Sequence, residues 1–387
     1  MSEQALLPRR REGGTLWSAH GLSPRQERIF HRLTALLVLT LGTGWVWSIW
    51  TTWIRTDEIA RIEADIHGYE TEVQPSPIAG RLAEALTARS AASMAFLNEA
   101  ALRYANPFRG YSGDVRMISG LPGMTLAEST DPGLGFVVGG TARKAEDLVL
   151  PPEPGIYDIE LALDRVTRDL PDLRVISLVP FSAKRAGKIG AYMLGSWPYE
   201  DGGTPRTPAY ADPAGFIEVP PEAREIQVSE HFRLGQFLTK GQEDVWPKYL
   251  LLEPRLLDKL ELMIEELEQE GVDVRHVTVM SGFRTPRYNV AGGRTAGRAN
   301  LSRHMYGDGA DVFLDNDRDF WTDDVNGDGR VNTADAEMMA RAAERVERKY
   351  PSLVGGIGIY PACCGHGPFV HIDVRGNRAR WRGSGTG

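Results

Sequence analysis

The stretch SRHMYGDGADV at residues 302–312 indicates both the fold and the chemistry of this chain. It places the imidazole of His304 and the carboxylate of Asp311 seven positions apart. Far downstream, FVHID at residues 369–373 puts His371 between apolar residues, as in a strand that directs alternate side chains into a site. Two histidines and one carboxylate suffice for catalytic zinc, which keeps a fourth position for water. Spacing alone also fits an accidental triple, because the chain has 8 histidines.

The residues before this stretch predict a helix followed by a strand. Pro254 suits a first helical turn, and apolar residues recur at helical spacing between Leu256 and Leu267, which predicts an amphipathic helix. Residues 274–280 then alternate apolar and polar side chains, as in a half-buried strand. We therefore expect an α+β fold, with a small antiparallel sheet flanked by helices.

Three ordered motifs carry a resemblance to a known family: SGFRTP at 281–286, SxHxxGxGAD at 302–311 and FVHID at 369–373. Together they resemble peptidase M15, the D-alanyl-D-alanine carboxypeptidase and endopeptidase family, and are most similar to its murein endopeptidases that end in a His-x-Asp motif. The resemblance implies a zinc peptidase domain over residues 228–381, with His304, Asp311 and His371 as zinc ligands. It implies hydrolysis of peptide bonds of bacterial peptidoglycan, as an endopeptidase or carboxypeptidase, by zinc-activated water.

The same resemblance assigns roles to Arg284 and Ser302 in binding substrate. Arg284 would pair with a substrate carboxylate or carbonyl, for which its planar, always charged fork is suited. A surface arginine in the turn before Pro286 is the alternative. Ser302 would orient the loop or support a ligand through its hydroxyl, and an ordinary turn serine is the alternative.

The general base that many relatives carry three positions before the last ligand is missing, because Pro368 occupies that position. Asp373 and His366 are the local candidates, either to take a proton or to orient a ligand. Asp373 is preferred, since strand alternation places it on the face of His371. Asp373, His366 and Arg284 are thus the predicted catalytic residues. The missing acid keeps open an alternative function, a non-catalytic wall-binding or scaffold protein with structural zinc and calcium.

A second motif, DVNGDGRVNTAD at residues 324–335, lies between the second and third zinc ligands. Oxygen-bearing side chains fall at positions 1, 3, 5, 9 and 12, with glycine at 6, as in an EF-hand loop. The loop resembles calcium loops of dockerin type and predicts a structural Ca²⁺, with a plain surface turn as the alternative. The predicted ligands are Asp324, Asn326, Asp328, the carbonyl of Arg330, Asn332 and Asp335. A helix is expected over residues 334–349, before Pro351.

The apolar run at residues 33–54 predicts a transmembrane helix, because 22 residues without a charge can span a hydrocarbon core about 30 Å thick. Residues 1–32 hold six arginines against three glutamates, which places this tail in the cytoplasm by the positive-inside rule. We expect a single-pass protein of the bacterial cytoplasmic membrane with a periplasmic catalytic domain. A cleaved signal peptide is the alternative.

The remaining segments indicate organisation more than chemistry. Residues 56–150 form an extracytoplasmic region without a chemical motif, and the breaker cluster PPEPG at 151–155 begins a small β module expected over residues 151–225. A net charge of -8 without a Lys/Arg-dense block argues against a nucleic-acid partner. Cys363 and Cys364 are read as two loop thiols, because adjacent cysteines rarely bond each other. Nothing in the sequence indicates an oligomeric state.

Overall fold

The computed structural model describes residues 112, 114–128, 134–140, 147–163, 166–293, 298–363 and 365–383. The chain divides into two compact units, Met1–Gln74 and Pro75–Gly387, and the described residues all belong to the second unit. The predicted cytoplasmic tail and the predicted membrane helix at 33–54 lie outside the described residues. Among the described residues, no helix combines the length and the hydropathy needed to cross a bilayer.

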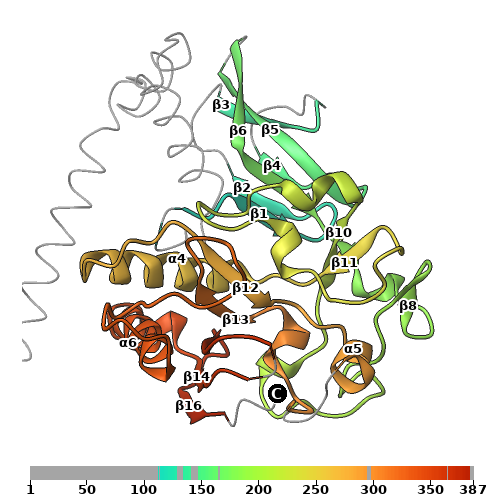
Figure 1. Cartoon of the computed structure of the whole chain (residues 1–387). Helices are drawn as coiled ribbons and strands as arrows, with labels where there is room; N and C mark the ends of the chain where they lie inside the picture. Colours follow the sequence, from blue (N-terminus) through green and yellow to red (C-terminus); the bar gives the residue numbers. More distant parts are fainter. Residues whose placement is uncertain are drawn as a thin grey trace, which may run out of the picture. The chain divides into compact units, whose positions relative to one another are not determined.

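A five-stranded sheet forms the centre of the C-terminal part (Figure 1). Its strands, in spatial order, are β12 (Val277–Ser281), β13 (Gly309–Leu314), β15 (Phe369–Asp373), β14 (Gly356–Tyr360) and β16 (Ala379–Arg382). Neighbouring strands are antiparallel except for β14 and β16, which are parallel. Every residue of β13 and β15 is buried. The fold is therefore mixed α+β with small sheets and few helices.

Two long helices contact this sheet through β15. Helix α4 (Pro254–Gln269) begins with proline in its first turn and buries Leu256, Leu260, Met263 and Leu267. Helix α6 (Thr333–Lys349) also contacts β14, and its first turn is capped by the Asn332 side chain. Helical periodicity predicted both helices, and the structure confirms them. A third, short helix is α5 (Pro286–Ala291).

A four-stranded sheet lies N-terminal to these elements in the sequence. Its spatial order is β1 (Met117–Gly120), β6 (Val166–Ser177), β5 (Gly155–Leu163) and β3 (Leu134–Val138), with only the β1–β6 pair parallel. Strands β2 (Thr125–Glu128) and β4 (Asp147–Val149) pair with each other. Because β1 and β3 come from before residue 151, the boundary expected there falls inside this sheet.

A three-stranded sheet joins the two parts. It consists of β11 (Lys248–Leu250), β10 (Gly215–Val219) and β7 (Val179–Pro180). Its β10–β11 pair bridges the boundary expected between residues 225 and 228, and one continuous core of buried residues extends from Val115 to Val374. The remaining elements are short: strands β8 (Lys188–Ile189) and β9 (Tyr192–Met193), and 3-10 helices η1 (Phe181–Ala183), η2 (Pro208–Tyr210), η3 (Pro221–Glu225), η4 (Leu234–Phe237), η5 (Arg303–Tyr306) and η6 (Pro351–Leu353).

Candidate metal centre

Three elements bring the predicted zinc ligands together: η5 carries His304, β13 carries Asp311 and β15 carries His371. The register of β13 and β15 places Asp311 directly opposite His371. The turn between η5 and β13 requires Gly307, which has a φ of 68°; a Cβ there would lie 2.3 Å from the Leu251 carbonyl oxygen. The sequence motif thus fixes a tight turn that returns the chain to the sheet beside His304.

Contacts outside the sheet hold η5 in place. The indole Nε1 of Trp197 donates a 2.9 Å hydrogen bond to the Met305 carbonyl oxygen, and both groups are buried. The buried guanidinium of Arg303 pairs with Asp308, its Nε 2.9 Å from Oδ1, and lies over the rings of Tyr210 and Tyr306. The segment that carries His304 is therefore fixed partly by residues 192–210 of the preceding β region.

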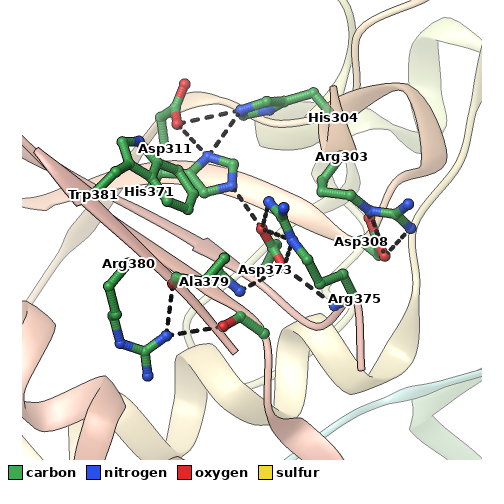
Figure 2. A network of polar contacts seen from close by, with 12 residues as sticks. Arg303, His304, Asp308, Asp311, His371, Asp373, Arg375, Ala379, Arg380 and Trp381 are labelled. Atoms are coloured by element: carbon green, nitrogen blue, oxygen red, sulfur yellow. Dashed lines mark hydrogen bonds and ion pairs between the residues drawn. The ribbon is translucent and has the colours of Figure 1, made fainter. Parts of the chain in front are cut away.

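The three candidate ligand atoms face one another (Figure 2). His304 Nε2 lies 3.2 Å from His371 Nδ1 and 3.2 Å from Asp311 Oδ1, and His371 Nδ1 lies 2.8 Å from the same carboxylate oxygen. Tetrahedral zinc with ligands at about 2.0–2.1 Å separates its ligand atoms by about 3.3 Å. The spacing of the three atoms fits a shared zinc ion with a fourth position free.

In each imidazole, the hydrogen bond made by the nitrogen that points away from the other two ligands determines the tautomer. His304 Nδ1 lies 2.7 Å from the carbonyl oxygen of Gly282, which can only accept, so this nitrogen carries the proton. His371 Nε2 lies 3.1 Å from the Asp373 carboxylate and donates to it. In the neutral imidazoles, His304 Nε2 and His371 Nδ1 then present lone pairs toward Asp311. Burial would lower the pKa of His371, but its hydrogen bonds with Asp311 and Asp373 raise it, so a proton on Nδ1 can satisfy Asp311 here and a metal cation would take the place of that proton.

Arg284 holds the carboxylate ligand in place. Its Nη2 donates to Asp311 Oδ2 at 2.7 Å, and its Nε donates to Ser281 Oγ at 2.8 Å. Burial alone would raise the pKa of Asp311, but His304 and Arg284 hold this pKa well below its usual range. Burial and the nearby Arg284 charge lower the pKa of His304 to about 4, which favours the neutral, metal-binding imidazole. Arg284 thus contacts a candidate metal ligand, and its expected contact with a substrate stays a prediction.

Asp373 lies on the His371 side of β15, as alternation predicted, but it contacts the nitrogen that faces away from the centre (Figure 2). Its side chain is fully buried, and its Oδ1 accepts from the Gly356 N–H at 2.7 Å and from Arg375 Nε at 2.9 Å. A Cβ on Gly356 would lie 2.2 Å from Asp373 Oδ2, so glycine is needed here. This geometry gives Asp373 a positioning role and does not support the expected proton transfer.

The three candidate ligands line a cavity with a volume of about 1320 Å³, and His366 and Tyr360 line it too. His366 lies at its wall with Nδ1 2.8 Å from the Gly367 carbonyl oxygen. Tyr360, at the end of β14, accepts a 2.8 Å hydrogen bond from Trp381 Nε1, and burial raises the pKa of its hydroxyl. Sequence reasoning missed Tyr360, because no spacing rule marks a tyrosine at a strand end. Its hydroxyl proton remains available for donation into the cavity.

Several cationic side chains line the cavity, and Ser302 lines it as well. Lys240, Arg284 and Arg298 line it; burial, followed by the Arg284 charge, lowers the pKa of both Lys240 and Arg298. Arg298 Nη1 donates to the carbonyl oxygens of Tyr288 and Gly292, each at 2.7 Å. Within the described part of the chain, no acidic side chain forms an ion pair with Lys240 or Arg298. We call Lys240, Arg284 and Arg298 the cationic wall.

The loop at residues 324–335 has the turn that its sequence predicted. Gly329, at position 6, has a φ of 82°. Asp324 Oδ1 accepts the N–H groups of Gly327 and Asp328, and Asp335 accepts those of Val325 and Asn332. The loop is thus ordered by its own carboxylates, and calcium binding stays a prediction.

One expectation changes in this region. Cys363 is disulfide-bonded, so the expectation of two free loop thiols is wrong. Ser302 precedes η5 and is buried, and its hydroxyl makes no hydrogen bond that caps η5; its expected role in orienting the loop or supporting a ligand stays a prediction. Support of η5 therefore comes from the contacts of Trp197 and Arg303.

No family model, curated protein or solved structure matches this chain. The function proposed for it therefore rests on its own residues and their geometry.

Proposed function

We propose that residues 228–381 act as a zinc-dependent peptidase that hydrolyses peptide bonds of bacterial peptidoglycan outside the cytoplasm. The convergence of His304 Nε2, His371 Nδ1 and Asp311 Oδ1, within 2.8–3.2 Å of one another, is the observation that carries the proposal. These three atoms would hold zinc, which supplies a Lewis acid and lowers the pKa of its bound water to about 7.

The groups around the centre fit a peptide substrate. The cationic wall offers positive charge to the carboxylates that peptidoglycan peptides carry, and among the described residues neither Lys240 nor Arg298 forms an ion pair with an acidic side chain. Tyr360 presents a hydroxyl that would donate to an oxygen gaining negative charge during hydrolysis. With Asp373 engaged by His371 and Arg375, His366 becomes the preferred group to move a proton in the cavity.

The setting of this activity is part of the proposal. Residues 33–54 would tether the chain to the cytoplasmic membrane, with the peptidase on the periplasmic side. Calcium in the loop 324–335 would fix the insertion that separates β13 from β15 in the sequence.

Cleavage of purified peptidoglycan tests the proposal. Full-length protein should release new peptide ends from the polymer, and a zinc chelator or His304→Ala should abolish the release. Asp244→Asn is the control, because this exposed side chain lies outside the cavity lining. Sedimentation of the protein with the polymer without new peptide ends would favour the wall-binding alternative. Release that persists in His304→Ala would reject the zinc centre.

A further inference from the structure

The nine residues that follow β13 form a second acidic loop, separate from residues 324–335. They read DNDRDFWTD at positions 315–323, with carboxylates at positions 1, 3, 5 and 9 of the loop. Oxygen atoms of Asp315, Asp317 and Asp319 lie within 4.8 Å of one another. Two ligands on opposite sides of Ca²⁺, at about 2.4 Å each, are about 4.8 Å apart. The three carboxylates therefore fit around one ion.

The backbone of this acidic loop repeats the turn of the predicted calcium loop. Positions 4 and 6 are Arg318 and Phe320, with φ of 61° and 68°, where the other loop has Gly327 and Gly329 with φ of 72° and 82°. A non-glycine residue in the left-handed region costs about 1–2 kcal/mol. The acidic loop thus adopts the same turn without the glycines that make it easy.

An independent observation concerns the first carboxylate of the loop. Asp315 is 1% exposed, and its Oδ2 accepts a 2.5 Å hydrogen bond from Thr278 Oγ1. Its Oδ1 is buried and has no hydrogen-bond partner in the described part of the chain. A buried, unpartnered carboxylate oxygen is costly, and a cation beside it removes that cost.

The charge around this oxygen is negative. Asp323, the fourth carboxylate, has its pKa raised by burial and by the charges of Asp317, Asp315 and Asp319. Among the described residues, no lysine or arginine forms an ion pair with any of these four. A set of oxygen donors with this much uncompensated charge suits a hard divalent cation rather than a softer metal.

We propose that residues 315–323 bind a divalent cation of the calcium class, at a site distinct from the loop 324–335. Asp315, Asp317 and Asp319 provide carboxylate ligands, the carbonyl of Trp321 occupies position 7, and Asp323 at position 9 acts through a water molecule, as in EF-hand loops. The site does not depend on peptidase activity, because it rests on the residues of this loop alone.

The position of the acidic loop gives the cation a structural task. Asp315 directly follows the last residue of β13, the strand that carries Asp311. Thr322 Oγ1 donates to the Pro368 carbonyl oxygen, one residue before β15, which carries His371. The cation would therefore brace the ends of two strands that hold the metal centre.

Terbium luminescence tests the proposal with the full-length protein, because Tb³⁺ replaces Ca²⁺ and emits when an adjacent indole absorbs. Trp321 lies in this loop, whereas the loop 324–335 has no aromatic residue. We expect Trp-sensitised emission that Ca²⁺ displaces, with Tb³⁺ affinity at least tenfold weaker in Asp317→Asn. The matched control, Asp273→Asn, removes an exposed charge nearby and should stay within twofold of wild type.

Calcium counting by equilibrium dialysis gives a second measurement. Asp317→Asn/Asp319→Asn should bind one calcium ion fewer than wild type. Asp328→Asn, which alters only the loop 324–335, should keep the sensitised emission. Absent emission in wild type, unchanged emission in Asp317→Asn, loss of emission in Asp328→Asn, or an unchanged calcium number in the double variant would each overturn the proposal.

Discussion

At the level of single side chains, the direction of one hydrogen bond decides what Asp373 does. Its carboxylate fixes the ring of His371 by accepting from Nε2, and the opposite nitrogen faces the other ligands. The charge and the burial of Asp373 would therefore act on a bound metal ion through the imidazole. A proton-transfer role would require a carboxylate on the other side of that ring.

Replacing Asp373 with asparagine should weaken zinc binding about 10- to 100-fold, because loss of such an outer partner reduces the basicity and the order of the ligand. Competition with a chromophoric chelator measures the affinity. The exposed Asp244→Asn is the control and should bind zinc as wild type does. Wild-type affinity combined with lost turnover would return Asp373 to the catalytic step.

Tyr360→Phe should lower kcat about 10²-fold and leave the zinc content unchanged, since it removes one hydroxyl donor from the cavity and no ligand. The comparison with His366→Gln separates the two roles: loss of a proton-transferring group changes the pH dependence of kcat, whereas loss of a fixed donor lowers kcat at every pH. Tyr199→Phe is the control, because its ring is outside the cavity lining. Unchanged kcat in Tyr360→Phe would remove that hydroxyl from the mechanism.

At the level of helices and strands, a buried ion pair joins α4 to α6. Lys259 Nζ lies 2.6 Å from Glu347 Oε1 and donates to the Asp373 carbonyl oxygen at 2.7 Å. Lys259→Met should lower the free energy of unfolding by about 1–3 kcal/mol, because it leaves the buried Asp373 carbonyl oxygen without this donor, while Arg380 still pairs with Glu347. Urea denaturation measures the loss. Breaking the exposed Arg382–Glu337 pair with Arg382→Ala should cost only about 0–1 kcal/mol.

A pH-dependent contact attaches the loop before η4 to α4. His231 Nδ1 lies 2.6 Å from Glu261 Oε2, and this hydrogen bond raises the pKa of His231 above its ordinary 6.5 despite its partial burial. Because the pKa of His231 is higher in the folded than in the unfolded state, the contact contributes its full stability below pH 6.5. This contribution is lost as the pH rises through the pKa of the folded state. The urea concentration at the midpoint of unfolding should decrease as the pH is raised from 6 to 8. The decrease should be smaller in His231→Gln. Equal falls in both proteins would contradict this assignment.

Short sequence patterns predicted the elements that depend on residues close together in the sequence. Periodicity and end signals located α4 and α6, and alternation located β15. The pairing of β1 with β6 joins residues more than fifty positions apart, for example Met117 with Arg174, and no local pattern encodes such a partner. The same limit applies to the site: motifs indicated its three ligands, but Tyr360 and the cationic wall come together only through the fold.

Considered as a whole, the described chain has one core rather than a β module beside a peptidase domain. Buried side chains from Trp197 and Phe216 belong to the same cluster as Leu250 and Leu257. A fragment beginning at residue 228 would leave β11 without its neighbour β10 and would remove Trp197 and Phe216 from the shared core. We expect this fragment to lack a cooperative unfolding transition by circular dichroism. A soluble fragment with a sharp transition and bound zinc would contradict the shared core.

The hydrogen bond from Trp197 to the Met305 carbonyl has a consequence for how such a chain can evolve. A donor outside the motif-bearing segment helps to set the position of His304, so the two segments must be inherited together. Recombination that replaced the N-terminal half of the chain with an unrelated sequence would remove one of the contacts that position His304. We expect the residues on the two sides of this contact to change together by single substitutions, and not by exchange of whole domains.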